Sequence, residues 1–128
     1  MPGRQLIMSF PVTATSHALP DYRARGGYGA LAKTLGQMKP QDVVKEVTAS
    51  GLQGRGGAAF AVGRKWQVVQ YDDGQPHYLI ANADEGEPGT FKDRVLLTSH
   101  ADLVFEGMTI AAYAIGASLG FLYLRGEY

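Results

Sequence analysis

Residues 77–89 read HYLIANADEGEPG, a short and largely apolar run that leads directly into a polar loop. Apolar runs of this length beside turn residues predict buried β-strands. We therefore expect a strand over residues 77–81 and a polar loop over residues 82–93. Side chains at the carboxyl end of a buried strand are rigidly held, which suits a binding site.

A second apolar run, FLYLR at residues 121–125, follows a long uncharged stretch. Asp102 suits the N-cap of a long helix that we expect to run to Leu119 and close at Gly120. The uncharged residues 107–124 reach the lower length limit of a membrane-spanning helix. We expect a soluble helix followed by a buried strand instead, because Gly120 divides the stretch.

Helix alternating with strand predicts an α/β fold, a Rossmann-like layer with parallel strands. Glycine and proline divide the earlier part of the chain into shorter pieces. The expected pieces are an irregular segment over residues 1–20, a short helix capped by Asp21, a helix over residues 28–35 ended by Gly36, a helix from Pro40 to a C′ residue at Gly51, a short helix over residues 64–70 and a turn over residues 72–74.

Composition excludes several classes of function. The chain has 12 Lys plus Arg and 12 Asp plus Glu, so its formal net charge is zero, which gives no electrostatic case for nucleic acid or an anionic membrane surface. It has no cysteine, which excludes disulfides and thiolate or iron–sulfur sites on these residues. The three histidines lack ligand spacing, so no metal site is expected. The first 16 residues lack an export signal.

A glycine-rich segment, GLQGRGGAAFAVG at residues 51–63, is the first candidate for chemistry. Glycine lets backbone N–H groups approach a phosphate or a flat ring without interference from a Cβ atom. Arg55, Arg64 and Lys65 add positive charge. The pattern matches neither a P-loop nor the classical dinucleotide fingerprint. From glycine content alone, phosphate binding and a plain mobile loop both remain open.

The polar loop after residues 77–81 is the second candidate. Asn82 can donate to and accept from the edge of a heterocycle, while Asp84 and Glu85 can accept hydrogen bonds from sugar hydroxyls. The residues alone leave three interpretations: a solvated acidic turn, an organic-ligand site, and a Mg²⁺ or Ca²⁺ site. The spacing does not match an EF-hand loop.

Taken together, four segments resemble one family in order and spacing: GGYGALAKTL, SGLQGRGGAAFAVGRKW, YLIANADEGEPGTFKDR and YLRGEY. They are similar to the flavin-binding subunit of respiratory complex I. The related diaphorase subunits of NAD-reducing hydrogenases and NAD-dependent formate dehydrogenases share this module. The resemblance spans residues 19–128, and it implies that residues 21–128 are the N-terminal part of an FMN- and NADH-binding domain that is incomplete at its C-terminus.

The resemblance also implies roles for individual residues. The glycine loop would lie against FMN and NADH, Lys65 would reach the flavin's polar edge or phosphate, and Phe60 would stack on adenine. Glu87 is the implied catalytic residue, because it would orient the nicotinamide carboxamide. The implied cofactor-binding residues are Gly54, Arg55, Gly56, Gly57, Phe60, Lys65, Asn82, Asp84, Glu85, Gly126 and Glu127.

Several positions depart from the family pattern, including Ala61, where the family's proline is missing. The family's loop usually reads GAGFPTG, where this chain has GAAFAVG. Ala59 therefore places a Cβ atom where the family pattern has glycine for close backbone approach or for a positive φ, and a strained fit would cost about 1 kcal/mol. Val68 stands where relatives often carry an aromatic residue against the adenine.

The implied function is hydride transfer from NADH to FMN, with onward electron transfer to iron–sulfur clusters. The implied cofactors are FMN and NAD(H), with a [4Fe–4S] cluster expected only on a further C-terminal part. The implied partners are a thioredoxin-like iron–sulfur subunit and a larger redox complex, in the cytoplasm or at the cytoplasmic face of the inner membrane. The alternatives are a hydrogenase or formate dehydrogenase diaphorase, a truncated inactive fragment, and a membrane-anchored protein.

Overall fold

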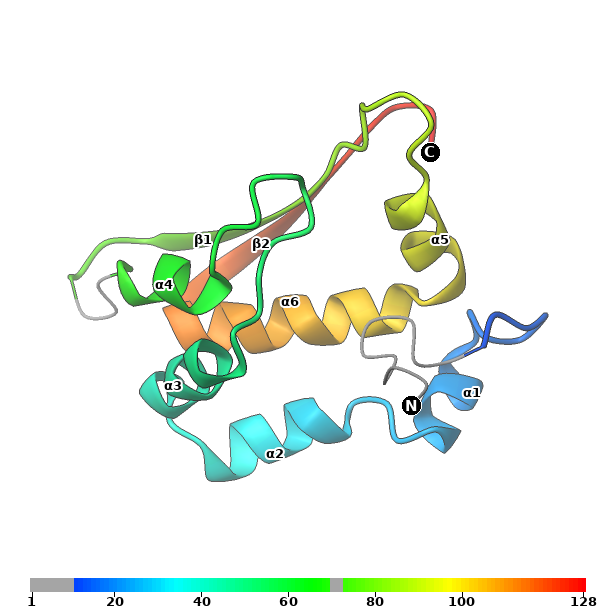
Figure 1. Cartoon of the computed structure of the whole chain (residues 1–128). Helices are drawn as coiled ribbons and strands as arrows, with labels where there is room; N and C mark the ends of the chain where they lie inside the picture. Colours follow the sequence, from blue (N-terminus) through cyan, green and yellow to red (C-terminus); the bar gives the residue numbers. More distant parts are fainter. Residues whose placement is uncertain (1–10, 70–72) are drawn as a thin grey trace, which may run out of the picture.

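A two-stranded parallel sheet lies across a long helix in the computed structural model, which describes residues 11–69 and 73–128 (Figure 1). The two strands pair along their full length, with Tyr78 opposite Leu119 and Ile80 opposite Phe121. This confirms the expected α/β layer with parallel strands. In chain order the elements are α1 (Leu19–Ala24), α2 (Gly29–Gln37), α3 (Pro40–Ser50), α4 (Val62–Gln67), β1 (His77–Ala83), α5 (Lys92–Ser99), α6 (Ala101–Ile115) and β2 (Ala117–Leu124).

Helix α6 is the centre of the packing, because it contacts both strands as well as α2, α3 and α5 (Figure 1). The buried apolar residues are Tyr22, Val43, Ala83, Ala111, Ala114 and Ile115, half of them on α6. The sheet face turned away from α6 carries Tyr78, Ile80 and Phe121, all of them exposed. The sheet is thus covered on one face by the described residues.

A buried carboxylate on α6 fixes the N-terminal helices. Glu106 accepts hydrogen bonds from the Tyr22 hydroxyl and from the backbone N–H groups of Tyr28 and Leu31, the last two at 3.0 Å. Tyr28 has a left-handed backbone with φ of 63°. Its hydroxyl donates to Asp102, and this hydrogen bond, with burial, raises the pKa of Tyr28 to about 12.

Several expected boundaries are wrong at the C-terminal half. Helix α6 ends at Gly116, which has a φ of 68°, and not at Gly120. Residues 117–120 belong to β2 because they pair with the first half of β1. His100, not Asp102, is the N-cap of α6, and Asp102 lies in its first turn. Helix α5 was not expected at all.

The N-terminal half holds smaller differences. Helix α1 begins at Leu19, so that Asp21 lies in its first turn and forms an ion pair with Arg25 at 3.4 Å, instead of capping the helix. Helix α2 continues past Gly36 to Gln37. Helix α3 is as expected, with Pro40 in its first turn and Gly51 at a φ of 68°. The predictions for residues 1–10, Gln70 and Asp72 lie outside the described residues.

No single helix in the described part of the chain is long and apolar enough to cross a membrane. Helices α5 and α6 meet that test of length and composition only as a pair, and they are bent by 96° relative to each other.

Candidate functional site

The two candidate loops line one cleft of about 520 Å³. It is larger than the hollow beside α3 and α4, of about 280 Å³, and the hollow beside α2 and α3, of about 270 Å³. Its volume lies in the range of small-molecule sites. The lining residues are Arg55, Gly56 and Gly57 from the glycine loop, Asn82 from β1, Asp84, Glu85, Glu87 and Thr90 from the loop after β1, and Lys92 and Asp93 from α5.

Backbone hydrogen bonds close the glycine loop at its base. The Gly54 N–H donates to the Phe60 carbonyl and the Val62 N–H donates to the Leu52 carbonyl, each at 2.9 Å. Between these bonds Gly57 has a φ of 103° and Ala59 has a φ of 50°. Of the two reasons for glycine at position 59, close approach and a positive φ, the structure shows the positive φ. A Cβ atom added at Gly56 or Gly57 would meet nothing within 4 Å, so open space adjoins the backbone there.

Arg55 stands in the cleft as an exposed cation. It makes no ion pair with any residue that the structure describes. Its guanidinium can therefore serve an anionic ligand without first leaving one of these residues.

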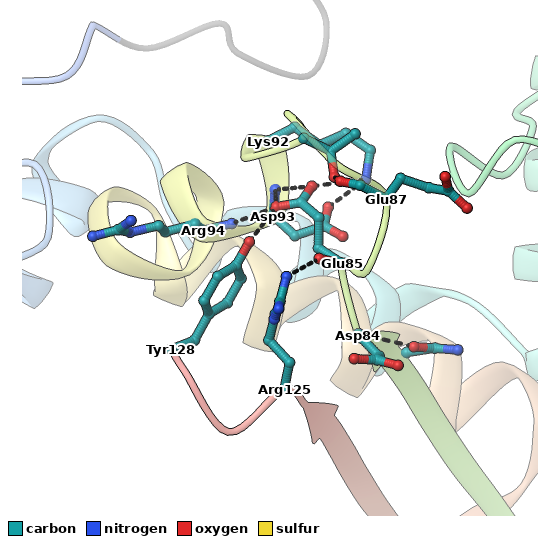
Figure 2. Close-up of polar contacts among 10 residues, drawn as sticks. Asp84, Glu85, Glu87, Lys92, Asp93, Arg94, Arg125 and Tyr128 are labelled. Atoms are coloured by element: carbon teal, nitrogen blue, oxygen red, sulfur yellow. Dashed lines mark hydrogen bonds and ion pairs between the residues drawn. The ribbon is translucent and has the colours of Figure 1, made fainter.

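Asn82, near the end of β1, is exposed in the cleft, as are Asp84 and Glu87 in the loop that follows. The Asp84 N–H donates to the Asn82 side-chain oxygen at 2.9 Å, and the Thr90 hydroxyl donates to the Glu87 carbonyl at 2.6 Å. Figure 2 shows the Glu87 side chain extending away from the cluster around Glu85. Two carboxylates and one amide are thus open to a ligand.

Glu85 differs from its neighbours because it is buried, with 6% of its surface exposed. Its carboxylate accepts hydrogen bonds from the Asp93 N–H at 3.0 Å and from the Tyr128 hydroxyl at 2.6 Å. Lys92 Nζ lies 3.5 Å away. Burial, the largest single influence, raises the pKa of Glu85, but these hydrogen bonds and the charge of Lys92 outweigh it and leave the pKa below its usual value.

The segment after β2 reaches the same loop. An Arg125 guanidinium nitrogen donates to the Glu85 carbonyl at 2.6 Å (Figure 2). Arg125 also forms an ion pair with Glu127 at 2.9 Å. Glu127 lines a smaller hollow beside α5, and neither it nor Gly126 lines the cleft. The structure therefore brings this segment to the loop through Arg125 and Tyr128.

Phe60 and Lys65 line a second hollow, of about 540 Å³, together with Arg64 and Val68. Lys65 Nζ lies 6.0 Å from the centre of the Phe60 ring, at the limit of a cation–π contact. Phe60 is 49% exposed, so its ring face is open to a planar partner. Gly54 lies at the base of the glycine loop and lines neither hollow.

Sequence reasoning missed Lys92 as a lining residue of the cleft. Its ammonium lies 2.7 Å from Asp93 and 3.5 Å from Glu85. These contacts raise the pKa of Lys92, with the hydrogen bond to Asp93 as the largest cause. The signal in the sequence is a lysine directly before Asp93 in the segment GEPGTFKDR.

Comparisons with known proteins identify the family to which the chain belongs. Residues 47–128 match the model of the family described as the Nuo51 FMN-binding domain. An NADH-quinone oxidoreductase subunit of Rhizobium meliloti is 51% identical over 112 residues, which are 88% of this chain and 27% of that protein. The NAD-reducing hydrogenase HoxS subunit alpha of Cupriavidus necator is 50% identical over 107 residues, 84% of this chain and 18% of that protein.

A solved structure shows the same fold. A chain of an NAD⁺-reducing [NiFe]-hydrogenase in the air-oxidized state matches with a TM-score of 0.69 and 42% identity. The match covers 93% of this chain and 20% of the hydrogenase chain. This chain spans about a quarter of the length of the NADH-quinone oxidoreductase relatives.

Proposed function

The chain belongs to the Nuo51 FMN-binding domain family, and we propose that its two facing loops hold FMN within an oxidoreductase that takes hydride from NADH. The observation that carries this proposal is the single cleft between the two loops, which the sequence separates by more than twenty residues. When bound, FMN would accept two electrons as a hydride from NADH and release them singly to iron–sulfur centres.

The donors and acceptors in the cleft fit FMN. Gly56 and Gly57 leave open space beside the backbone, as a flat ring or a phosphate at close range requires. Asn82 and Asp84 offer an amide and a carboxylate for the ring edge and the ribityl hydroxyls. Arg55 offers the phosphate a guanidinium that has no ion-pair partner among the described residues.

The second hollow fits the adenosine part of NADH. Phe60 presents an exposed ring face for stacking, and Lys65 supplies a nearby positive charge. Val68 is 75% exposed on the same hollow and gives a smaller apolar contact than an aromatic residue would. Glu87, exposed in the main cleft, would orient the nicotinamide carboxamide.

The work of these residues is positioning. Hydride transfer between two stacked rings needs no acid or base from the protein, so the rate depends on how closely and how firmly the rings are held. The two relatives described above are subunits of NADH-quinone oxidoreductase and of NAD-reducing hydrogenase. We propose that this chain likewise works within a larger redox complex, with a thioredoxin-like iron–sulfur subunit as its electron acceptor.

Fluorescence titration of the 128-residue chain with FMN tests the proposal. We expect saturable quenching at micromolar FMN, and we expect Asn82→Ala/Asp84→Ala to abolish it. The matched control is Gln37→Ala/Glu46→Ala, which removes the same kinds of functional group from α2 and α3, outside the cleft. A folded chain that leaves flavin fluorescence unchanged, or that binds equally well without Asn82 and Asp84, would contradict the proposed site.

A further inference from the structure

We propose that Tyr128, Arg125 and Glu85 form a clasp, a set of hydrogen bonds that fixes the position of the loop after β1. Glu85 then acts on flavin binding by holding this loop in place and not by contacting the flavin. This inference rests on the proposed function, because it concerns the same cleft. It assigns a role to Tyr128, which does not line the cleft.

The accepting capacity of the Glu85 carboxylate is already used. One oxygen accepts from the Tyr128 hydroxyl at 2.6 Å, and both approach the Asp93 N–H, at 3.2 and 3.0 Å. The Arg94 N–H lies 3.5 Å from the first oxygen and Lys92 Nζ lies 3.5 Å from the second. A carboxylate has about four lone-pair sites, so little capacity remains for a ligand hydroxyl.

Glu85 also caps the N-terminus of α5, whose own N-cap residue provides no side-chain cap. Phe91, at the N-cap position, makes no side-chain capping bond. The first N–H groups of a helix need acceptors, and a negative charge there is favoured by the helix dipole. Helix α5 has only 8 residues, too few for stability on its own, so a cap from outside the helix matters more.

The clasp therefore joins three segments that are distant in sequence: the loop after β1, the first turn of α5 and the segment after β2. Arg125 fixes the backbone of Glu85 through its carbonyl, while Tyr128 fixes the side chain (Figure 2). Asp84 and Glu87 lie within two residues of this fixed point. Their placement in the cleft follows from it, and small displacements of such groups are costly in binding and catalysis.

A double-mutant cycle on FMN binding separates positioning from direct contact. We expect Tyr128→Phe to weaken FMN binding by about tenfold, since it removes one hydrogen bond to a charged group. We expect Glu85→Gln to weaken binding to a similar degree, and the double variant to bind no more weakly than the weaker-binding single variant, because both break one clasp. At saturating FMN, the circular dichroism of the bound flavin should change in all three variants.

Tyr78→Phe is the matched control, because Tyr78 is exposed near the other end of β1 and its hydroxyl makes no hydrogen bond with the described residues. It should leave both the affinity and the flavin signal unchanged. The proposal is overturned if Tyr128→Phe binds FMN as the unaltered chain does while Glu85→Gln does not, since Glu85 would then contact the flavin directly. Additive losses in the double variant would overturn it too.

A second measurement keeps the clasp testable if the proposed function fails. Should the unaltered chain bind no FMN, amide resonances of the free chain decide the question. Tyr128→Phe should then shift the Asp93, Arg94 and Glu87 amides, because the clasp links them. Shifts confined to the neighbours of residue 128 in the sequence would show that Tyr128 positions nothing.

Discussion

The two loops that face each other across the cleft are held in different ways. The loop after β1 is fixed by side chains from three segments, with Glu85 buried at its centre. The glycine loop is closed by backbone hydrogen bonds at its base, and between them no side chain of residues 54–60 forms a hydrogen bond with the described residues. The loop after β1 therefore forms a fixed wall of the cleft. The glycine loop forms a free wall, which can adjust to a ligand.

This difference suits a site in which one ligand stays bound while a second ligand binds and leaves. Ordering a loop on binding costs free energy, so the fixed wall favours a cofactor that stays bound. A backbone wall without side-chain anchors can follow a ring or a phosphate at low steric cost. We therefore predict that changes in the fixed wall alter the placement of the bound flavin as well as its affinity, and that changes at the tip of the glycine loop alter affinity with little effect on stability.

Gly63→Ala should give the largest loss of stability. Gly63 is buried where α4 meets α3, and a Cβ atom there would lie 2.3 Å from the Thr48 hydroxyl and 2.5 Å from its Cα atom. We expect the free energy of unfolding to fall by about 2 kcal/mol, because backbone atoms must move. Urea unfolding measures it.

Gly56→Ala is the matched variant at the tip of the glycine loop, which leads into α4. Its added Cβ atom meets nothing within 4 Å, so the free energy of unfolding should change by less than about 0.5 kcal/mol. FMN affinity should fall nonetheless, because the methyl group enters the cleft. Equal losses of stability in the two variants would remove the distinction between the fixed base and the free tip.

Arg55→Ala should have the next largest effect, which is a loss of FMN affinity. Loss of one guanidinium from a phosphate contact should weaken FMN binding by about tenfold, and the remaining binding should depend less on salt. Stability should not change, since Arg55 has no ion-pair partner among the described residues. FMN titrations at two ionic strengths measure both effects. Arg23→Ala, at an exposed position on α1, is the control. Similar losses of FMN affinity in the two variants would refute a phosphate contact at Arg55.

Acid should loosen the fixed wall before it affects the glycine loop. The pKa of Glu85 is lower in the folded chain than its ordinary value of about 4.3, so its contribution to stability is present above that pH and is lost as pH falls through the lower folded value. Residues 51–63 contain no Asp, Glu or His. Hydrogen-exchange protection of the Asp93 amide should therefore fall at higher pH than that of Gly54.

Glu85→Gln provides the control for this titration, because the variant has no carboxylate to protonate at that position. Its Asp93 amide should show less protection throughout and a weaker dependence on pH. If protection of both loops falls together in the unaltered chain, global unfolding accounts for the loss and the local comparison is wrong.

Local sequence signals predict the elements whose bounds depend on neighbouring residues alone. Pro40 and Gly51 bound α3 as expected, and the apolar run at residues 77–81 is part of β1. The loop motifs predicted both walls of the cleft.

Long-range contacts determine what the sequence did not predict. Helix α5 depends on a cap from Glu85, which lies outside it, and Glu85 in turn binds Tyr128, 43 residues away. Tyr28 adopts a positive φ beside Glu106, which is 78 residues away. Gly116 and Gly120 are equal stop signals locally, and pairing of residues 117–120 with β1 decides between them. None of these partners is visible in a local pattern.

Ala59→Gly should give the smallest effect and the sharpest check on the glycine loop. Ala59 has a φ of 50°, a left-handed conformation that costs a residue with a Cβ atom about 1 kcal/mol. Glycine removes that cost but adds freedom to the unfolded chain, so a net gain of about 0.5 kcal/mol is expected. Thermal and urea unfolding measure it, with Ala58→Gly as the control that should instead lose stability. A loss of stability at both positions would mean that the loop does not hold Ala59 in the left-handed region, and the free wall would then be looser than the comparison requires.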